Sequence, residues 1–187
     1  MEVKVGNFTF IATKIPELIV IEPKVYGDSR GFFLETYHKE SFAEGGIEAD
    51  FVQDNHSRST KGVLRGMHFQ VKNPQGKLVR VISGEVYDVA VDMRKNSTTF
   101  RQWYGLVLSE GNKKMMYVPE GFAHGFFVLS DYAEFTYKCT RFYDRSDESG
   151  FRYDDKTVDI SWPLEGIVPL VSDKDLQLGG FLEASTF

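Results

Sequence analysis

The sequence predicts an all-β domain of the sandwich or barrel class, and three observations support this. Apolar and polar residues alternate with a period of two over most of the chain, which is typical of strands. Turn residues separate these segments about every eight to twelve positions, as in β-sandwiches and barrels. Aromatic residues make up 14% of the 187 residues, with 16 Phe and 9 Tyr. They favour strands and aromatic-lined pockets over a helical bundle.

Three pairs of strands are expected in the middle of the chain. Each pair flanks a short run of glycine, serine, asparagine or aspartate, which are typical of tight turns. We therefore expect each pair to form a hairpin. The pairs are Lys77–Ile82 with Glu85–Met93, Trp103–Leu108 with Lys113–Val118, and Gly121–Leu129 with Glu134–Thr140.

Alternation also predicts which residues share a face of a strand. Val86, Asp88, Ala90 and Asp92 lie on one face of their strand, and Tyr87, Val89 and Val91 lie on the other. In the same way, Phe135, Tyr137 and Cys139 share one face of a later strand.

Outside these strands the sequence predicts little helix. The one good candidate is His38–Glu44, which Gly45-Gly46 ends. Beyond residue 145 the pattern weakens, and the C-terminal segment is expected to pack on the main sheet as a strand or short helix. No linker interrupts the chain, so residues 1–187 are expected to form a single domain.

Charge and composition exclude several classes of protein. The net charge is −5 without a basic block, which argues against a non-specific nucleic-acid binder. The single cysteine, Cys139, cannot form an intramolecular disulfide. The N-terminus lacks the apolar core of a signal peptide, and the longest apolar stretches are too short to span a bilayer. We expect a soluble cytoplasmic protein without a membrane partner.

His68 lies in the segment Gly62–Gln70, which we interpret as a strand with Arg65 on the opposite pleat from His68. Imidazole is the side chain best suited to proton transfer near neutral pH. A histidine within a strand is nevertheless more often structural. The residues around it therefore leave a structural and a catalytic role open.

His124 lies in Pro119–Gly125, a Pro-x-Gly-x-x-His pattern that resembles the second motif of the cupin β-barrels, where the histidine binds a metal. The first cupin motif should supply His-x-His, but this chain has His68-Phe69-Gln70. Two histidines and a glutamine make a poor zinc site, because a third strong ligand is missing. We therefore expect no metal cofactor.

Other polar residues allow two interpretations each. Arg30 follows a turn and is either a solvated loop residue or a phosphate ligand. The segment around Asn55 is either a turn or a set of donors and acceptors for a polar ligand. Lys77 begins a strand, where lysine usually faces solvent, and Tyr137 is equally consistent with a core aromatic. Asp175 lies in what would ordinarily be a charged loop.

Taken together, these segments resemble the dTDP-4-dehydrorhamnose 3,5-epimerase family, in the family's order and over most of the chain. Two small departures, Met67 for leucine and Phe69 for tyrosine, involve side chains that perform no chemistry. The matching segments are Asp28–Phe33, Phe51–Ser57, Gly62–Gln70, Gln75–Val79, Gly84–Val89, Pro119–Phe126 and Ser172–Asp175.

The resemblance implies a cupin-type jelly-roll barrel with a few short helices, a homodimer, and neither metal nor nicotinamide. It implies a dTDP-linked 4-keto-6-deoxy sugar as substrate, in the pathway to dTDP-L-rhamnose. His68 matches the base, Asp175 the carboxylate that holds it, Tyr137 the acid, and Lys77 the lysine near the keto oxygen. Tyr143 matches the aromatic residue that stacks on thymine. The other residues matching substrate ligands are Arg30, Phe32, Glu35, Gln53, Asn55, Arg65, His124, Glu148 and Lys174.

These residues suit the chemistry that the resemblance implies. Epimerisation beside a ketone needs a base, a cation at the developing oxyanion and an acid on the far face of the ring, and no redox cofactor. A dimer is plausible because Phe8–Thr13 and Leu18–Glu22 would otherwise leave an exposed sheet edge. We expect these strands to cross to the partner and complete its sheet.

Three alternatives stay open. The first is an epimerase of the same fold that inverts only C3 or only C5 of a related sugar. The second is a metal-dependent cupin oxygenase or isomerase, against which Gln70 argues. The third is a non-catalytic sugar-nucleotide-binding module, which would not require a base, a cation and an acid together.

Overall fold

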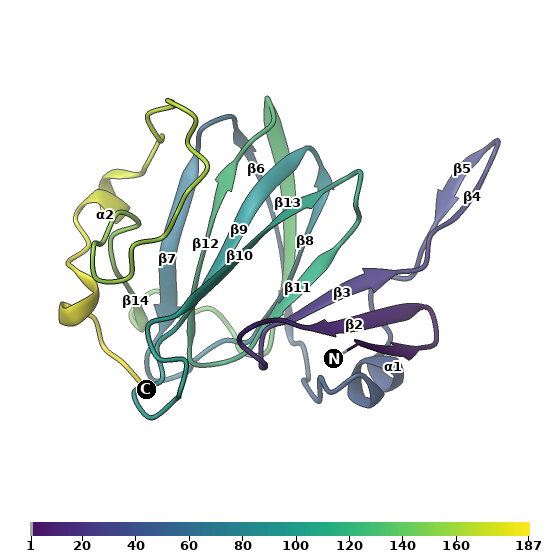
Figure 1. The fold of residues 1–187 in the computed structure, drawn as a ribbon, viewed down its shortest axis with the longest axis horizontal. Helices are drawn as coiled ribbons and strands as arrows, with labels where there is room; N and C mark the ends of the chain where they lie inside the picture. Colours follow the sequence, from purple (N-terminus) through teal and green to yellow (C-terminus); the bar gives the residue numbers. More distant parts are fainter. Residues whose placement is uncertain (1) are drawn as a thin grey trace.

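Two antiparallel sheets face each other in the computed structural model of the protein, which describes residues 2–187 (Figure 1). The prediction of an all-β fold is confirmed. The larger sheet contains, in spatial order, β1 (Glu2–Val5), β2 (Phe8–Ala12), β3 (Ile19–Pro23), β11 (Met115–Val118), β8 (Lys77–Ser83), β13 (Tyr132–Cys139) and β6 (Gln53–Thr60). The smaller sheet contains β10 (Trp103–Ser109), β9 (Glu85–Asp92), β12 (Phe122–Val128), β7 (Leu64–Gln70) and β14 (Glu148–Gly150).

The three predicted hairpins are wrong, although their strands lie where the sequence places them. In each pair, one strand belongs to the larger sheet and the other to the smaller sheet: β8 and β9, β10 and β11, and β12 and β13. The turn residues reverse the chain, but the chain then crosses from one sheet to the other. Gly84 illustrates this corner, since its φ is +77° and a Cβ there would lie 2.0 Å from the carbonyl oxygen of Tyr132. Such crossings produce the jelly-roll arrangement.

The predicted faces of β9 are confirmed. Val86 and Ala90 point between the two sheets and belong to the main core. Val89 and Val91 point to the outside of the smaller sheet, where Phe151 covers them together with other C-terminal residues. Figure 1 shows this C-terminal segment lying along the β7 side of the barrel. Burial on both faces explains why β9 is apolar at most positions.

The C-terminal segment includes two short helices, α2 (Asp173–Leu176) and the 3-10 helix η1 (Phe181–Glu183). α2 packs against β7. Ser172 begins α2, because its hydroxyl accepts a hydrogen bond from the backbone N–H of Asp175 at 3.1 Å. This cap fixes the direction in which the Asp175 side chain leaves the helix.

The N-terminal strands pair within their own chain. β2 pairs with β3, and β3 pairs with β11 of the same sheet. Both strands therefore have neighbours within their own chain, and the expectation that they also complete a partner's sheet stays a prediction. The predicted helix is present as α1 (Lys39–Glu44), with His38 as its N-cap, and it covers β2 through edge-on contacts of Phe42.

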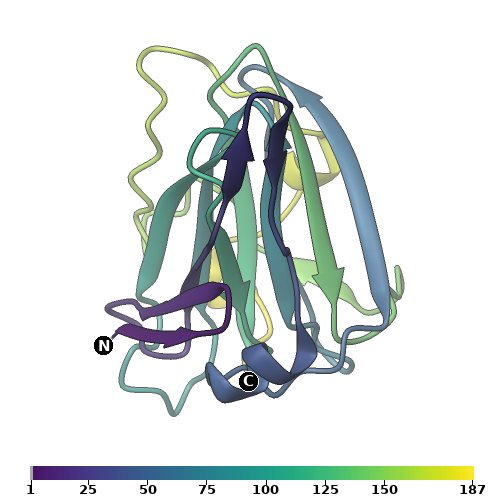
Figure 2. The same ribbon diagram turned by 90° about the vertical axis from the view of Figure 1, so that its right-hand side faces the viewer.

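A two-stranded arm formed by β4 (Tyr26–Asp28) and β5 (Gly31–Phe33) stands away from the barrel in Figure 1. Figure 2 shows the same molecule from the side of this arm. Its tip exposes large apolar side chains, since Phe32 and Phe33 are 61% and 65% accessible to solvent. Within residues 2–187, no helix has the length and apolar character needed to cross a membrane.

Candidate active site

A cavity of about 550 Å³ lies on the side of the barrel where α2 packs against β7. All four residues predicted to be catalytic, His68, Lys77, Tyr137 and Asp175, line it. They come from β7, β8, β13 and α2, so both sheets and the C-terminal segment contribute. The predicted substrate ligands that line the same cavity are Arg65, His124, Tyr143, Glu148 and Lys174. Gln53 and Asn55 line an adjoining cavity of about 210 Å³ together with His68 and Lys77.

His68 and Asp175 form a hydrogen-bonded dyad. The distance from His68 Nε2 to Asp175 Oδ1 is 2.8 Å, and the backbone N–H of Gly66 donates to the other oxygen at 3.3 Å. Burial raises the pKa of Asp175, but the hydrogen bond and charge of His68 and the bond from Gly66 outweigh burial and lower this pKa overall. The carboxylate is therefore ionised at neutral pH and can only accept. Nε2 carries the shared proton, which leaves the lone pair on Nδ1 for a base.

Arg65 faces the same cavity as His68, contrary to the prediction from alternation. Arg65 pairs with Phe126 and His68 pairs with His124, so three steps along β7 correspond to two steps along β12. This register shift is a β-bulge, and one extra residue reverses which side chains share a face. The bulge therefore brings a guanidinium and an imidazole to one side of the sheet.

Lys77 and Tyr137 supply a cation and a phenol inside the barrel. Burial lowers the pKa of Lys77, while Cys139, Asp88 and Glu148 act in the opposite direction. Burial also raises the pKa of Tyr137, with a further contribution from Cys139. The phenol therefore keeps its proton at neutral pH and can donate it.

Three side chains form a cluster at the solvent-facing side of the cavity. Glu148 Oε2 accepts hydrogen bonds from Tyr143 Oη and from Lys174 Nζ, both at 2.5 Å. The hydrogen bond to Glu148 is the main reason that the pKa of Tyr143 rises to about 12. Burial alone would raise the pKa of Glu148, but its bonds to Lys174 and Tyr143 lower it overall. The cluster therefore presents a neutral phenol beside a paired carboxylate and ammonium group.

Three predicted substrate ligands lie apart from this cavity. Arg30 and Phe32 are on the projecting arm, where Arg30 pairs with Asp28 at 2.6 Å. Glu35 lies at the base of the arm and accepts a hydrogen bond from Asn7 at 2.7 Å. Within one chain, these residues do not join the others.

Asp88 is a further residue of the site that the sequence motifs did not predict. Asp88 is completely buried in β9, and both of its oxygens lie 3.0 Å from Nε2 of His124. The signal was available, because two aspartates, Asp88 and Asp92, share a face with Val86 and Ala90. An acidic residue at a core position requires a partner and so marks a polar site.

Gln70, which stands where a cupin would place a metal ligand, has a different role. Its amide donates to the backbone oxygen of Asn73 and accepts from the backbone N–H of Asp144, both at 2.7 Å. It therefore holds two loops together. Within residues 2–187, no three histidine, cysteine or acidic side chains converge as a metal site would require.

The fold and the site define a jelly-roll protein with an enclosed acid–base pocket. Residues 12–183 match the family model described as dTDP-4-dehydrorhamnose 3,5-epimerase. The chain is 53% identical to the dTDP-4-dehydrorhamnose 3,5-epimerase of Shigella flexneri, covering 95% of this chain and 98% of that protein. It is also 53% identical to the Methanothermobacter thermautotrophicus enzyme of that name, over 91% of this chain and 92% of that protein.

A solved structure agrees with these relatives. The dTDP-6-deoxy-D-glucose-3,5-epimerase of Legionella pneumophila, in complex with dTDP-4-keto-L-rhamnose, matches with a TM-score of 0.91 and 50% identity over 94% of each chain. The chain belongs to the dTDP-4-dehydrorhamnose 3,5-epimerase family.

Proposed function

We propose that this protein epimerises C3 and C5 of dTDP-4-dehydro-6-deoxy-D-glucose to give dTDP-4-dehydro-L-rhamnose. The observation that carries the proposal is that the His68–Asp175 dyad, Lys77 and Tyr137 open onto one cavity. Those groups are the base, the cation and the acid that the reaction needs. The names and bound ligand of the related enzymes support the choice of substrate.

In this mechanism His68 Nδ1 removes the proton from a carbon beside the ketone. The ketone acidifies both neighbouring carbons, so one base can serve C3 and C5 in turn. The positive charge that His68 acquires is stabilised by Asp175, which also fixes the tautomer. Orienting carboxylates of this kind act through the histidine and do not themselves take the proton.

Lys77 stabilises the negative charge that develops on the ketone oxygen. A single donor at a developing oxyanion contributes about 3 kcal/mol to transition-state stabilisation. Tyr137 returns a proton from the opposite face of the sugar ring, which inverts the carbon centre. Burial raises the pKa of Tyr137, so its hydroxyl is protonated and ready to donate.

The nucleotide part of the substrate anchors the sugar over the base. Arg65 and Lys174 provide positive charge for the diphosphate, and Tyr143 provides an aromatic face for thymine. Lys174 is held by Glu148 in this structure, so the diphosphate competes for it. Binding energy from these remote groups places the reacting carbons where His68 needs them.

Incubation with the 4-keto substrate in heavy water tests the proposal. Proton NMR should show deuterium at both C3 and C5, together with conversion to the L-rhamno product. Label at only one carbon would indicate the mono-epimerase alternative. An unchanged substrate would refute the proposed activity.

The homodimer is part of the same proposal, and the position of the arm supports it. Arg30 and Phe32 match family substrate ligands but lie outside the cavity of their own chain. A second copy can bring these residues to the first copy's cavity, and contact with it would cover the exposed Phe32 and Phe33.

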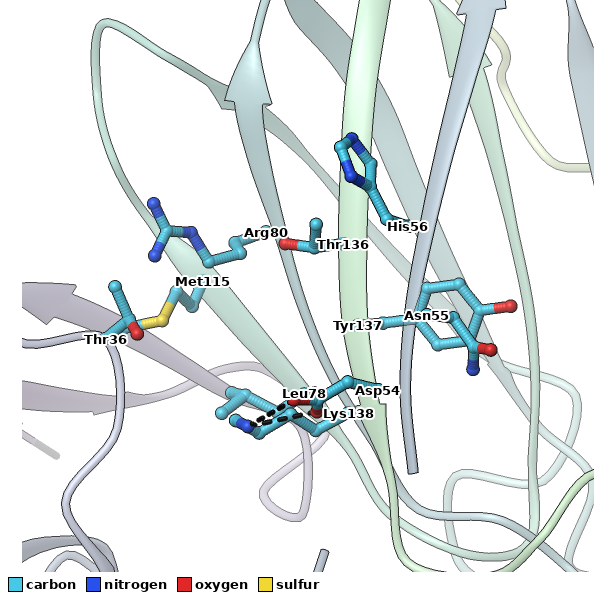
Figure 3. A pocket seen from close by; sticks show the side chains of 10 residues that line it. All are labelled: Thr36, Asp54, Asn55, His56, Leu78, Arg80, Met115, Thr136, Tyr137 and Lys138. Carbon is cyan, nitrogen blue, oxygen red and sulfur yellow. Dashed lines mark hydrogen bonds and ion pairs between the residues drawn. The ribbon is translucent and has the colours of Figure 1, made fainter. Parts of the chain in front are cut away.

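A groove with a volume of about 310 Å³ on the outer face of the larger sheet is also available for contact with a second copy. In Figure 3 its Arg80, Thr36 and Met115 lie on the opposite side of the strands from Asn55 and Tyr137.

Subunit complementation tests this arrangement directly. A mixed dimer of His68→Ala and Arg30→Ala subunits has one fully functional site only if Arg30 acts in its partner's cavity. We expect mixing and refolding two inactive variants to restore activity. Absence of restored activity, or sedimentation as a monomer at micromolar concentration, would contradict the proposal. We further propose that the chain forms a single domain and acts in the cytoplasm.

A further inference from the structure

Two loops beside the active site are joined by buried polar side chains. One loop follows β7 at residues 71–73, and the other, at residues 142–147, leads into β14 and contains Tyr143. Gln70 and Asp147 connect the two loops, and these residues are only 3% and 6% exposed. Buried polar groups form hydrogen bonds inside the protein, so their partners show which segments they hold in place.

Gln70 binds the backbone on both sides of Tyr143. Its Nε2 donates to the carbonyl oxygen of Phe142 at 3.4 Å, and its Oε1 accepts from the backbone N–H of Asp144 at 2.7 Å. Nε2 also donates to the carbonyl oxygen of Asn73 at 2.7 Å. Both hydrogens of the amide are therefore used within the protein, which leaves Gln70 no donor for a substrate. Its bonds fix the peptide units that flank Tyr143.

Asp147 fastens the second loop to the first. Each of its carboxylate oxygens accepts one backbone N–H, from Lys72 at 2.8 Å and from Asn73 at 2.7 Å. Its own backbone oxygen accepts from the N–H of Val71 at 3.2 Å. Hydrogen bonds to an ionised carboxylate are stronger than those between neutral groups. The loop that contains Tyr143 therefore cannot shift without breaking several bonds.

The Tyr143 ring is held in one orientation while one side of it stays accessible. Gln53 accepts the backbone N–H of Tyr143 at 2.9 Å, and Glu148 accepts its hydroxyl hydrogen. Tyr143 is nevertheless half exposed and lines the cavity. An aromatic surface that is fixed before a ligand arrives binds more tightly than a mobile one, because less conformational entropy is lost on binding.

We propose that Gln70 and Asp147 are positioning residues for nucleotide binding, a loop clamp that holds the Tyr143 ring ready to stack on the base. The inference rests on the proposed function, since the base belongs to the dTDP part of that substrate. The clamp acts through Tyr143, because its own hydrogen-bonding groups are bound to backbone. The position at which a cupin would carry a metal ligand, that of Gln70, thus supports nucleotide binding in this chain.

The variants Gln70→Met and Asp147→Asn open the clamp from either loop. Met has nearly the shape of Gln but cannot form its three hydrogen bonds, and Asn would point an amide hydrogen at a backbone N–H. Isothermal titration calorimetry with dTDP should show a Kd about tenfold higher in each variant. This rise lies within the roughly 5- to 150-fold that stacking of one base on an aromatic ring contributes to affinity.

Steady-state kinetics distinguish a loss of nucleotide binding from damage to the catalytic groups. KM for the 4-keto substrate should rise as the Kd for dTDP does, while kcat stays within about threefold of the wild-type value. A fall in kcat with an unchanged Kd for dTDP would overturn the inference. If one of the two variants does not fold, the other tests the same loop.

Asp92→Asn is the matched control for effects on stability. Asp92 is also a buried carboxylate that accepts a backbone N–H, that of Arg94 at 2.9 Å, but it is not among the residues that line the cavity. This substitution should destabilise the fold and leave the Kd for dTDP unchanged. An equal rise in Kd in Asp92→Asn would overturn the inference, because a loss of stability would then account for the effect.

A double-mutant comparison shows whether the clamp acts through the aromatic ring. In a Tyr143→Ala background, adding Gln70→Met should change the Kd for dTDP by less than about twofold, because the ring that the clamp positions is already absent. A tenfold effect that persists in this background would overturn the inference, since the clamp would then act on another part of the site.

These measurements separate the inference from the proposed function. A wild-type protein that binds dTDP but leaves the 4-keto substrate unchanged would refute the function, and the calorimetry would still test the clamp. An active wild type whose Gln70→Met and Asp147→Asn variants bind dTDP with an unchanged Kd would overturn the inference and leave the epimerase proposal standing.

Discussion

Replacing Asp175 by Asn should abolish most of the activity while leaving the fold intact. The substitution keeps the size of the side chain but removes its negative charge. Asn can donate an amide hydrogen to Nε2 of His68, where Asp175 now accepts at 2.8 Å. His68 would then carry its proton on Nδ1, and the nitrogen facing the substrate could not act as a base.

The magnitude follows from the two functions that the carboxylate loses. It selects the tautomer of His68, and it stabilises the imidazolium that forms when the substrate is deprotonated. Where such a carboxylate has been replaced by its amide, kcat falls by up to about 10⁴-fold. Asp175 is only 4% exposed, so little solvent can substitute for its charge. We expect a loss of about 10³-fold or more, which corresponds to about 4 kcal/mol of transition-state stabilisation.

Deuterium incorporation from heavy water measures the deprotonation step itself. In Asp175→Asn the label at C3 and C5 should appear as slowly as product does, because both depend on His68. Asp173→Asn is the matched control, since Asp173 lies in the same helix and is exposed to solvent. That control should behave as the wild type. Wild-type exchange rates in Asp175→Asn would refute the dyad as the source of the base.

Three further predictions concern the acid, the metal and the stability of the fold. Tyr137→Phe should reduce product formation by about 10²–10⁴-fold. Deuterium exchange should continue in this variant, because His68 still removes protons from the substrate. Full product formation by Tyr137→Phe would show that another group protonates the far face of the sugar ring. Incubation with EDTA should leave kcat unchanged, whereas a loss that a divalent ion reverses would revive the metal-cupin alternative. Burial raises the pKa of Asp92, but hydrogen bonds from Arg94, Ser97 and Thr99 outweigh it and bring the pKa to about 2 from 3.8. Because the pKa of Asp92 is lower in the folded protein than in the unfolded chain, the ionised carboxylate stabilises the fold at pH values above the unfolded-state pKa of 3.8, and this stabilisation is lost as the pH falls through about 2. Asp92→Asn should therefore reduce the free energy of unfolding at pH 7 by about 2 kcal/mol. Denaturant titrations at pH 7 and pH 2 should show that difference disappear in acid, and a difference that persists at pH 2 would contradict the assignment.

Local features of the sequence predicted the strands, the one longer helix and the faces of β9 correctly. These features depend on neighbouring residues along the chain, such as the period of two and the Gly45-Gly46 stop. The order of strands in the sheets depends on which segments meet in space. The turn at Gly84 fits a hairpin as well as a crossing between sheets, so the three predicted pairings were wrong.

The same distinction applies to the site. The family motifs gave His68, Lys77, Tyr137 and Asp175, and the structure gathers all four around one cavity. Arg65 was misplaced because a bulge in β7 is invisible to strict alternation. Asp88 was missed because its importance depends on His124, which is 36 positions away in the sequence.

The sequence by itself determined the all-β class, the strand positions and the chemical types available for catalysis, because these follow from side-chain chemistry and local periodicity. Only the tertiary structure decided which sheet each strand joins, which carboxylate each histidine binds, and that the arm with Arg30 stands apart from the cavity. Those outcomes depend on contacts between distant segments, and such contacts are selected by the packing of the whole chain.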